Sequence, residues 1–193
     1  EPILAIRLTD FNLSPFWIGI FFILNPTSYL LVSLVITWFT YYLDNKNLIA
    51  LGMLVWGLSQ FLVGPSLFLP DSLIIMGFGQ FFVGGSAVLF WITALPEMIK
   101  DVIKTHPKQK FEASDISSGV FNSMLGLGQM ISPLYGSYVT KESGFRWWAD
   151  SVGYMLIFYS IIYFIFWIGT FALFPTEADK LYQIHEQKKA ENV

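Results

Sequence analysis

The sequence has no cysteine and few charged residues. Without cysteine there is no disulfide framework and no thiolate metal site. Asp, Glu, Lys and Arg make up 13% of the 193 residues, about half the share found in soluble domains. The formal net charge is −3 and no basic block stands out, which excludes nucleic-acid binding and charge-rich disorder.

Apolar residues take the place of the missing charges. They form 54% of the chain, with 19 Phe and 7 Trp, and the mean hydropathy is +0.57. A soluble domain of this length cannot bury so much apolar surface, because much of even an ordinary protein's exposed surface is already apolar. We therefore expect lipid to be the solvent for much of the chain.

Uncharged stretches divide the chain into segments long enough to cross a bilayer, which needs roughly 20 helical residues. Barrel strands would need about 10 residues of alternating polarity, and no such alternation is present. We predict an all-α integral membrane protein. The expected spans are 16–40, 48–69, 72–98, 115–139 and 151–174, with 1–8 as the end of a further helix and 175–193 as a polar tail. The chain is therefore expected to be a fragment or a processed product.

Lys and Arg in the predicted loops indicate the orientation. The loops 41–47, 99–114 and 175–193 would share one side and carry eight lysines, whereas the other side carries Arg7, Lys141 and Arg146. The positive side is expected to be cytoplasmic, so the C-terminus is predicted to be cytoplasmic.

The segment 115–139 carries small residues in a regular pattern. Gly128, Ser132 and Gly136 lie four residues apart on one helical face, where small side chains let another helix approach closely. Pro133 is expected to kink the helix in the same stretch. We predict a packing face. Asn122, on the same helix, would either line a water-filled cavity or bond to a neighbouring helix.

Other polar residues interrupt the remaining spans. Asn25 and Pro26 lie near the middle of 16–40, an arrangement typical of a solute pathway. Glu97 follows Pro96 at the end of 72–98, where it would be either a gating or proton-linked group or a solvated end residue. Asp44 lies in the turn YYLDNKN. Glu1, if it lies deep, would be an intramembrane acid, which is a functional hypothesis by default.

Several enzymatic signatures are missing. The sequence has no phosphate-binding loop of the Walker type and no spacing of metal ligands, and both histidines stand alone in predicted loops. We expect no enzymatic activity, no metal and no cofactor.

Four stretches give the chain a resemblance to a known family. EPILAIRL, YYLDNKN, the segment from Gly64 to ALPEM, and SGVFNSMLGLGQMISPLYGSYVTKESGFRW resemble the C-terminal six-helix half of a major facilitator superfamily transporter. Within this superfamily, the four stretches look most like the vesicular amine transporter family and its polyamine branch. Trp91 and Asn122 stand where the monoamine branch has acids, and Ser132 replaces a Gly.

The resemblance implies a function and a set of site residues. It implies proton-coupled exchange of a small organic cation, a polyamine or amine, by alternating access in an acidic vesicle, a vacuole or the plasma membrane. An N-terminal half, in the same chain or another, would complete the site. The implied substrate and proton residues are Glu1, Asn25, Tyr29, Trp91 and Asn122. The implied cytoplasmic gate consists of Asp44 and Glu97.

A second reading is a truncated, non-transporting membrane subunit that acts as a scaffold in a larger complex. The start at Glu1 and the weakened turn motif around Asp44 motivate it. A channel subunit is less favoured, because no filter motif is visible.

Overall fold

A computed structural model describes residues 2–66, 69–105 and 110–169, and within these ranges the chain is helical with no strand. The helices are α1 (Pro2–Thr9), α2 (Pro15–Tyr42), α3 (Asn45–Val63), α4 (Leu73–Thr105), α5 (Lys110–Ser143) and α6 (Phe145–Tyr163). A π-helical segment, η1 (Phe164–Gly169), continues α6. The prediction of an all-α fold is therefore confirmed for the described residues.

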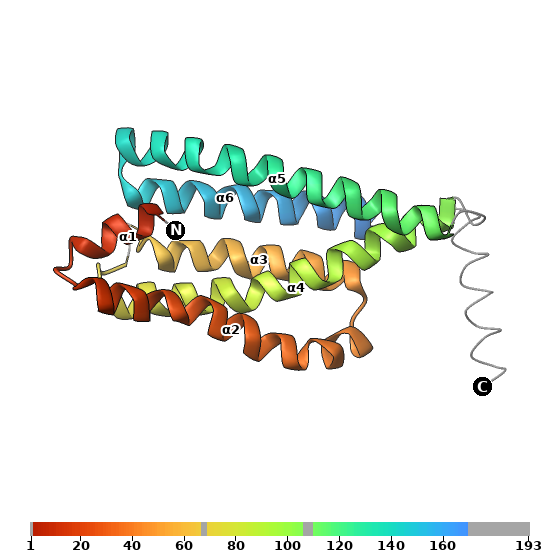
Figure 1. Cartoon of the computed structure of the whole chain (residues 1–193), viewed down its shortest axis with the longest axis horizontal. Coiled ribbons are helices and arrows are strands. Elements are labelled where there is room, and N and C mark those ends of the chain that lie inside the picture. Colours follow the sequence, from red (N-terminus) through yellow and green to blue (C-terminus); the bar gives the residue numbers. More distant parts are fainter. Residues whose placement is uncertain (1, 67–68, 106–109, 170–193) are drawn as a thin grey trace.

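The long helices run side by side and form a bundle (Figure 1). α3 packs against α4 and α6, and α2 packs against α4. α5 runs along α6 and contacts α4, but less extensively than α3 does. The short helix α1 lies at one end of the bundle, near the beginning of α6 (Figure 1).

Residues that disfavour continued helix mark the connections. α2 begins at Pro15, a favoured residue at the first helical position, and α3 ends before Gly64 and Pro65. Between α5 and α6, Gly144 has a φ of 92°, a backbone conformation that side chains disfavour. This glycine lets two long helices join through a single residue.

Each predicted span corresponds to a helix, but several ends differ. The span predicted as 48–69 is helical only as far as Val63, because Gly64 and Pro65 follow it, and α6 begins at Phe145 rather than at 151. α4 continues beyond Glu97 to Thr105, so Pro96 lies inside the helix and does not end it. α5 also begins before the predicted 115–139 and ends after it. The predicted ends were placed where charged residues begin, because charges are unfavourable in lipid. Most charged residues are nevertheless good helix formers, so the helices continue through them. The tail 175–193 and the end of the span 151–174 lie outside the described residues.

Four helices within the described residues are long and apolar enough to cross a membrane: Pro15–Tyr41, Asn45–Val63, Leu73–Lys104 and Phe145–Phe166. The sequence predicted five full spans, and α5 is the one that falls short. Its Gly, Ser, Asn and Gln residues lower its hydropathy, although its length suffices. By length and composition the fold is compatible with a multi-pass membrane protein.

The centre of the bundle is held by close backbone approach. Gly57 of α3 and Gly153 of α6 face each other so closely that a Cβ at Gly57 would lie 3.0 Å from the carbonyl oxygen of Gly153. Ser160 of α6 donates a hydrogen bond of 2.8 Å to the carbonyl oxygen of Ala50 in α3. Small residues at such crossings favour helix packing in lipid, where the hydrophobic effect is weak.

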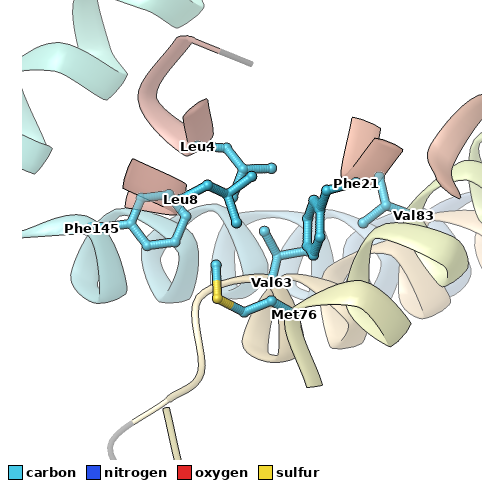
Figure 2. Close-up of a cluster of buried hydrophobic side chains, with 7 residues drawn as sticks. All are labelled: Leu4, Leu8, Phe21, Val63, Met76, Val83 and Phe145. Carbon is cyan, nitrogen blue, oxygen red and sulfur yellow. The ribbon is translucent and has the colours of Figure 1, made fainter. Parts of the chain in front are cut away.

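A cluster of buried apolar side chains joins α1 to the bundle (Figure 2). Leu4 and Leu8 of α1 are 3% and 0% exposed. The cluster also contains Phe21, Val63, Met76, Val83 and Phe145, which come from α2, α3, α4 and α6 (Figure 2). This end of the bundle is therefore densely packed.

Candidate functional site

The described residues line an open cavity of about 860 Å³ between α3, α4, α5 and α6. This volume is within the range of small-molecule sites. Most of its lining is aromatic, Leu, Ile or Met, and few polar groups reach it. The lining residues are Ile49, Met53, Trp56, Phe90, Trp91, Ala94, Glu97, Met98, Asp101, Val102, Phe121, Met124, Leu125, Gly128, Gln129, Ser132, Tyr159 and Tyr163.

Aromatic rings from three helices meet on the cavity wall. The ring centroids of Trp91 and Phe121 lie 5.7 Å apart and those of Phe90 and Trp91 lie 5.3 Å apart, in both cases edge to face. Trp56 of α3 contacts Phe90 in the same way, at 6.5 Å. Such rings pack against apolar ligands and also attract cations through their faces.

Two carboxylates of α4 line the cavity, one helical turn apart. Glu97 is only 4% exposed, whereas the side chain of Asp101 is 28% exposed. Lys46 at the start of α3 places its Nζ 3.7 Å from Glu97 Oε1 and 3.9 Å from Asp101 Oδ1. Lys100 and Lys104 lie near the same two carboxylates, at 4.0 Å and 3.8 Å. Charged groups thus surround a buried acid beside an apolar cavity.

A second charged group lies toward the end of the bundle that contains α1. Asp71, just before α4, pairs through Oδ2 with Arg7 of α1 and with Arg146 of α6, the latter at 3.0 Å. Arg7 also pairs with Asp10. Asp150 of α6 is 5% exposed and accepts a hydrogen bond from Ser66. This group connects helices and does not line the cavity.

The structure brings two of the sequence-predicted functional residues together. Trp91 and Glu97 both line the cavity. Asn25 does not line it, and its amide instead donates a hydrogen bond of 3.3 Å to Gln80 Oε1 of α4. Tyr29 and Asn122 lie on exposed surfaces of α2 and α5.

The remaining predicted residues lie away from this site or outside the described part. Asp44 is an exposed residue in the turn before α3. Glu1 lies outside the described residues. Pro133 lies inside α5, which continues through it.

The predicted packing face of α5 divides into two parts. Gly128 and Ser132 line the cavity, and no atom lies within 4 Å of the place where a Cβ at Gly128 would be. At Gly136, by contrast, a Cβ would lie 2.6 Å from Ile3 Cδ1 and 3.0 Å from Trp148 Nε1. A Cβ at Gly136 would therefore meet neighbouring side chains, whereas the Gly128 position faces the cavity.

This difference predicts opposite results for two matched substitutions. Gly136→Leu should lower the free energy of unfolding by about 1–3 kcal/mol, because the new side chain overpacks the contact with Ile3 and Trp148. Gly128→Leu should leave stability nearly unchanged and should fill part of the cavity instead. Thermal unfolding of the two variants in detergent tests this difference, and a larger loss at Gly128 would contradict it.

Sequence reasoning missed most of the cavity wall. Lys46 entered only the count of loop charges, and Trp56, Phe121 and Tyr163 were unremarkable members of apolar spans. One available signal was that Lys46 and Glu97 were both predicted at the same side of the membrane, at the ends of separate spans. Within the described residues, no group of three His, Asp or Glu side chains is placed to hold a metal.

Comparison with known proteins does not identify a family, because no family model, curated protein or solved structure matches the chain.

Proposed function

We propose that the chain is a membrane-embedded half of a secondary transporter that exchanges a small organic cation for protons by alternating access. The observation that carries this proposal is the aromatic cavity with a buried carboxylate, Glu97, on its wall. Aromatic faces and a carboxylate are the two groups that bind an ammonium ion with an apolar body. The resemblance of the sequence to major facilitator transporters supports the same function.

The two exposed helix surfaces support the idea that a second half is needed. α2 exposes large apolar side chains such as Trp17, Leu34 and Trp38, which suit contact with lipid. α5 also exposes apolar side chains such as Leu134, but its exposed surface includes Asn122 as well, and a Cβ at Gly126 would meet nothing within 4 Å. Small and polar residues suit contact with another helix or with water. In the proposal, α5 therefore faces the second half and the central passage, and α2 faces lipid.

Uptake into vesicles tests the proposed function. The complete protein in liposomes, given a proton gradient, should accumulate spermidine or serotonin and should not accumulate a neutral sugar. Collapse of the gradient should stop the accumulation. Absence of uptake for every amine tested would refute transport and leave the scaffold as the better reading.

Trp91 is expected to affect this uptake directly. Trp91→Ala should lower the initial rate about tenfold at low substrate, since a cation–π contact contributes roughly 0.5–2 kcal/mol. Trp147→Ala is a matched control, because Trp147 is 54% exposed and does not line the cavity. Equal rates in the two variants would remove Trp91 from the proposed site.

A further inference from the structure

Glu97 is an incompletely satisfied carboxylate on the cavity wall. Its side chain is 5% exposed, and within the described residues Oε1 accepts no hydrogen bond although it is buried. A buried carboxylate normally requires several hydrogen bonds or a close cation. Lys100 Nζ lies 4.0 Å from the other oxygen, Oε2, so Glu97 still demands a closer positive group.

Lys46 meets this demand only in part. Its Nζ lies 3.7 Å from Glu97 Oε1 and 3.9 Å from Asp101 Oδ1, whereas charge-assisted hydrogen bonds span about 2.7–2.9 Å. Lys46 thus lies between two carboxylates of α4 without close contact to Glu97. Lys46 is not part of the cavity wall, whereas both carboxylates are.

We infer that Lys46 acts as an internal cation that neutralises Glu97 in the empty protein, and that the ammonium group of a ligand in the cavity takes its place. This inference rests on the proposed function and adds the residue that recognises the cation and the residue that competes with it. One carboxylate cannot pair at full strength with two cations, so the lysine lowers the apparent affinity of the ligand. The rings of Trp91 and Phe121 would hold the apolar body of the ligand.

The exchange would also couple ligand binding in the cavity to the contact between α3 and α4 at one end of the bundle. Lys46 lies two residues after Asp44, in the first turn of α3, and its contacts with Glu97 and Asp101 link α3 to α4 there. A ligand that replaces Lys46 at Glu97 removes one of these links. Ligand occupancy would thereby alter how firmly the two helix ends are held together.

Binding of phenethylammonium to the complete purified protein in nanodiscs, measured by calorimetry, tests the exchange. Lys46→Met should bind this probe about tenfold more tightly, because the competing cation is gone. Glu97→Gln should bind it about tenfold or more weakly, because the charge that recognises it is gone. The double variant should bind as weakly as Glu97→Gln alone, since Lys46 acts through Glu97.

Two controls separate the exchange from a general change in charge or packing. Lys104→Met removes the same charge from the same end of the bundle, but Lys104 pairs with Asp101 at 3.8 Å, and affinity should stay within about twofold. The neutral analogue 2-phenylethanol has the same apolar body, and Lys46→Met should not alter its binding. Lys46→Arg should weaken binding of the cation, because an arginine fork pairs more strongly with a carboxylate.

Several outcomes would overturn the inference. The first is an unchanged affinity for phenethylammonium in Lys46→Met, or an equal gain in affinity for 2-phenylethanol. The second is a gain in affinity that persists in the double variant. The third is no binding of phenethylammonium by either the wild type or Lys46→Met. If Lys46→Met does not fold, Lys46→Arg supplies the test, and unaltered affinity there overturns the inference. If only the uptake experiment fails, transport is refuted, but the measured affinities still decide whether Lys46 and the ligand compete for Glu97.

Discussion

Gly84→Ala is expected to lower the free energy of unfolding by about 2–4 kcal/mol, a large effect for one methyl group. A Cβ at Gly84 would collide with the carbonyl oxygen of Asn25 and lie 2.9 Å from its carbonyl carbon. These atoms belong to the backbone of α2, which cannot yield as the tip of a side chain can. The substitution should therefore push α2 away from α4.

The position of Gly84 explains why α2 depends on it. Only a narrow stripe of α2 is buried, at Phe21, Ser28 and Ile36, and this stripe faces α4. The hydrogen bond from Asn25 to Gln80 lies along the same contact. Displacing α2 by even part of an ångström would loosen all of these contacts together.

Gly19→Ala provides the matched control for this prediction. Gly19 lies inside α2, and nothing lies within 4 Å of its Cβ position. Alanine there should be neutral or should stabilise the protein by roughly 0.5–1 kcal/mol, because alanine is the better helix former. Thermal unfolding of both variants in detergent is the measurement. Similar stabilities would show that α2 and α4 adjust to a Cβ at their crossing.

The helical segments could be predicted from the sequence because charges and turn residues delimit them. Ser14 with Pro15, Asp44 with Asn45, and Gly64 with Pro65 mark the start or the end of α2 and α3. The ends of α4 and α5 could not be predicted in the same way. The charged residues after Glu97 leave the apolar stretch but stay helical, as their intrinsic propensities allow.

The site could be predicted only in part, because a cavity depends on how helices diverge. Glu97 stood out as a carboxylate at the end of an apolar span, and Trp91 stood out only through the resemblance, because it occupies a position where the monoamine branch has an acid. The pairing of Asn25 with Gln80 could not be predicted, because it depends on the packing of α2 against α4. The same holds for Lys46, whose role depends on the distance between the ends of α3 and α4.

Gly128 shows the limit of pattern reasoning on a single helix. Its spacing with Ser132 and Gly136 is typical of a packing face, and at Gly136 the side chains of Ile3 and Trp148 lie close. Two turns earlier the same face opens onto the cavity. The spacing of small residues fixes which residues share a face but not how far away the next helix lies.

Asp71→Ala is expected to cause the second large loss of stability, about 2–3 kcal/mol. Its carboxylate pairs with both Arg7 of α1 and Arg146 of α6. Removing it leaves two arginines facing each other without the shared anion, so repulsion is added to the lost attraction. The side chain of Asp71 is 33% exposed, which keeps the expected loss below that of a fully buried pair.

Asp10→Ala distinguishes this effect from a general loss of negative charge. Asp10 pairs with Arg7 at 3.0 Å, but its side chain is 58% exposed, so its removal should cost at most about 1 kcal/mol. Hydrogen exchange supplies a local readout, because α1 is held by the Asp71 pair and by the burial of Leu4 and Leu8. Amides of α1 should exchange faster in Asp71→Ala than in Asp10→Ala. Equal exchange in the two variants would show that apolar burial alone holds α1 against the bundle.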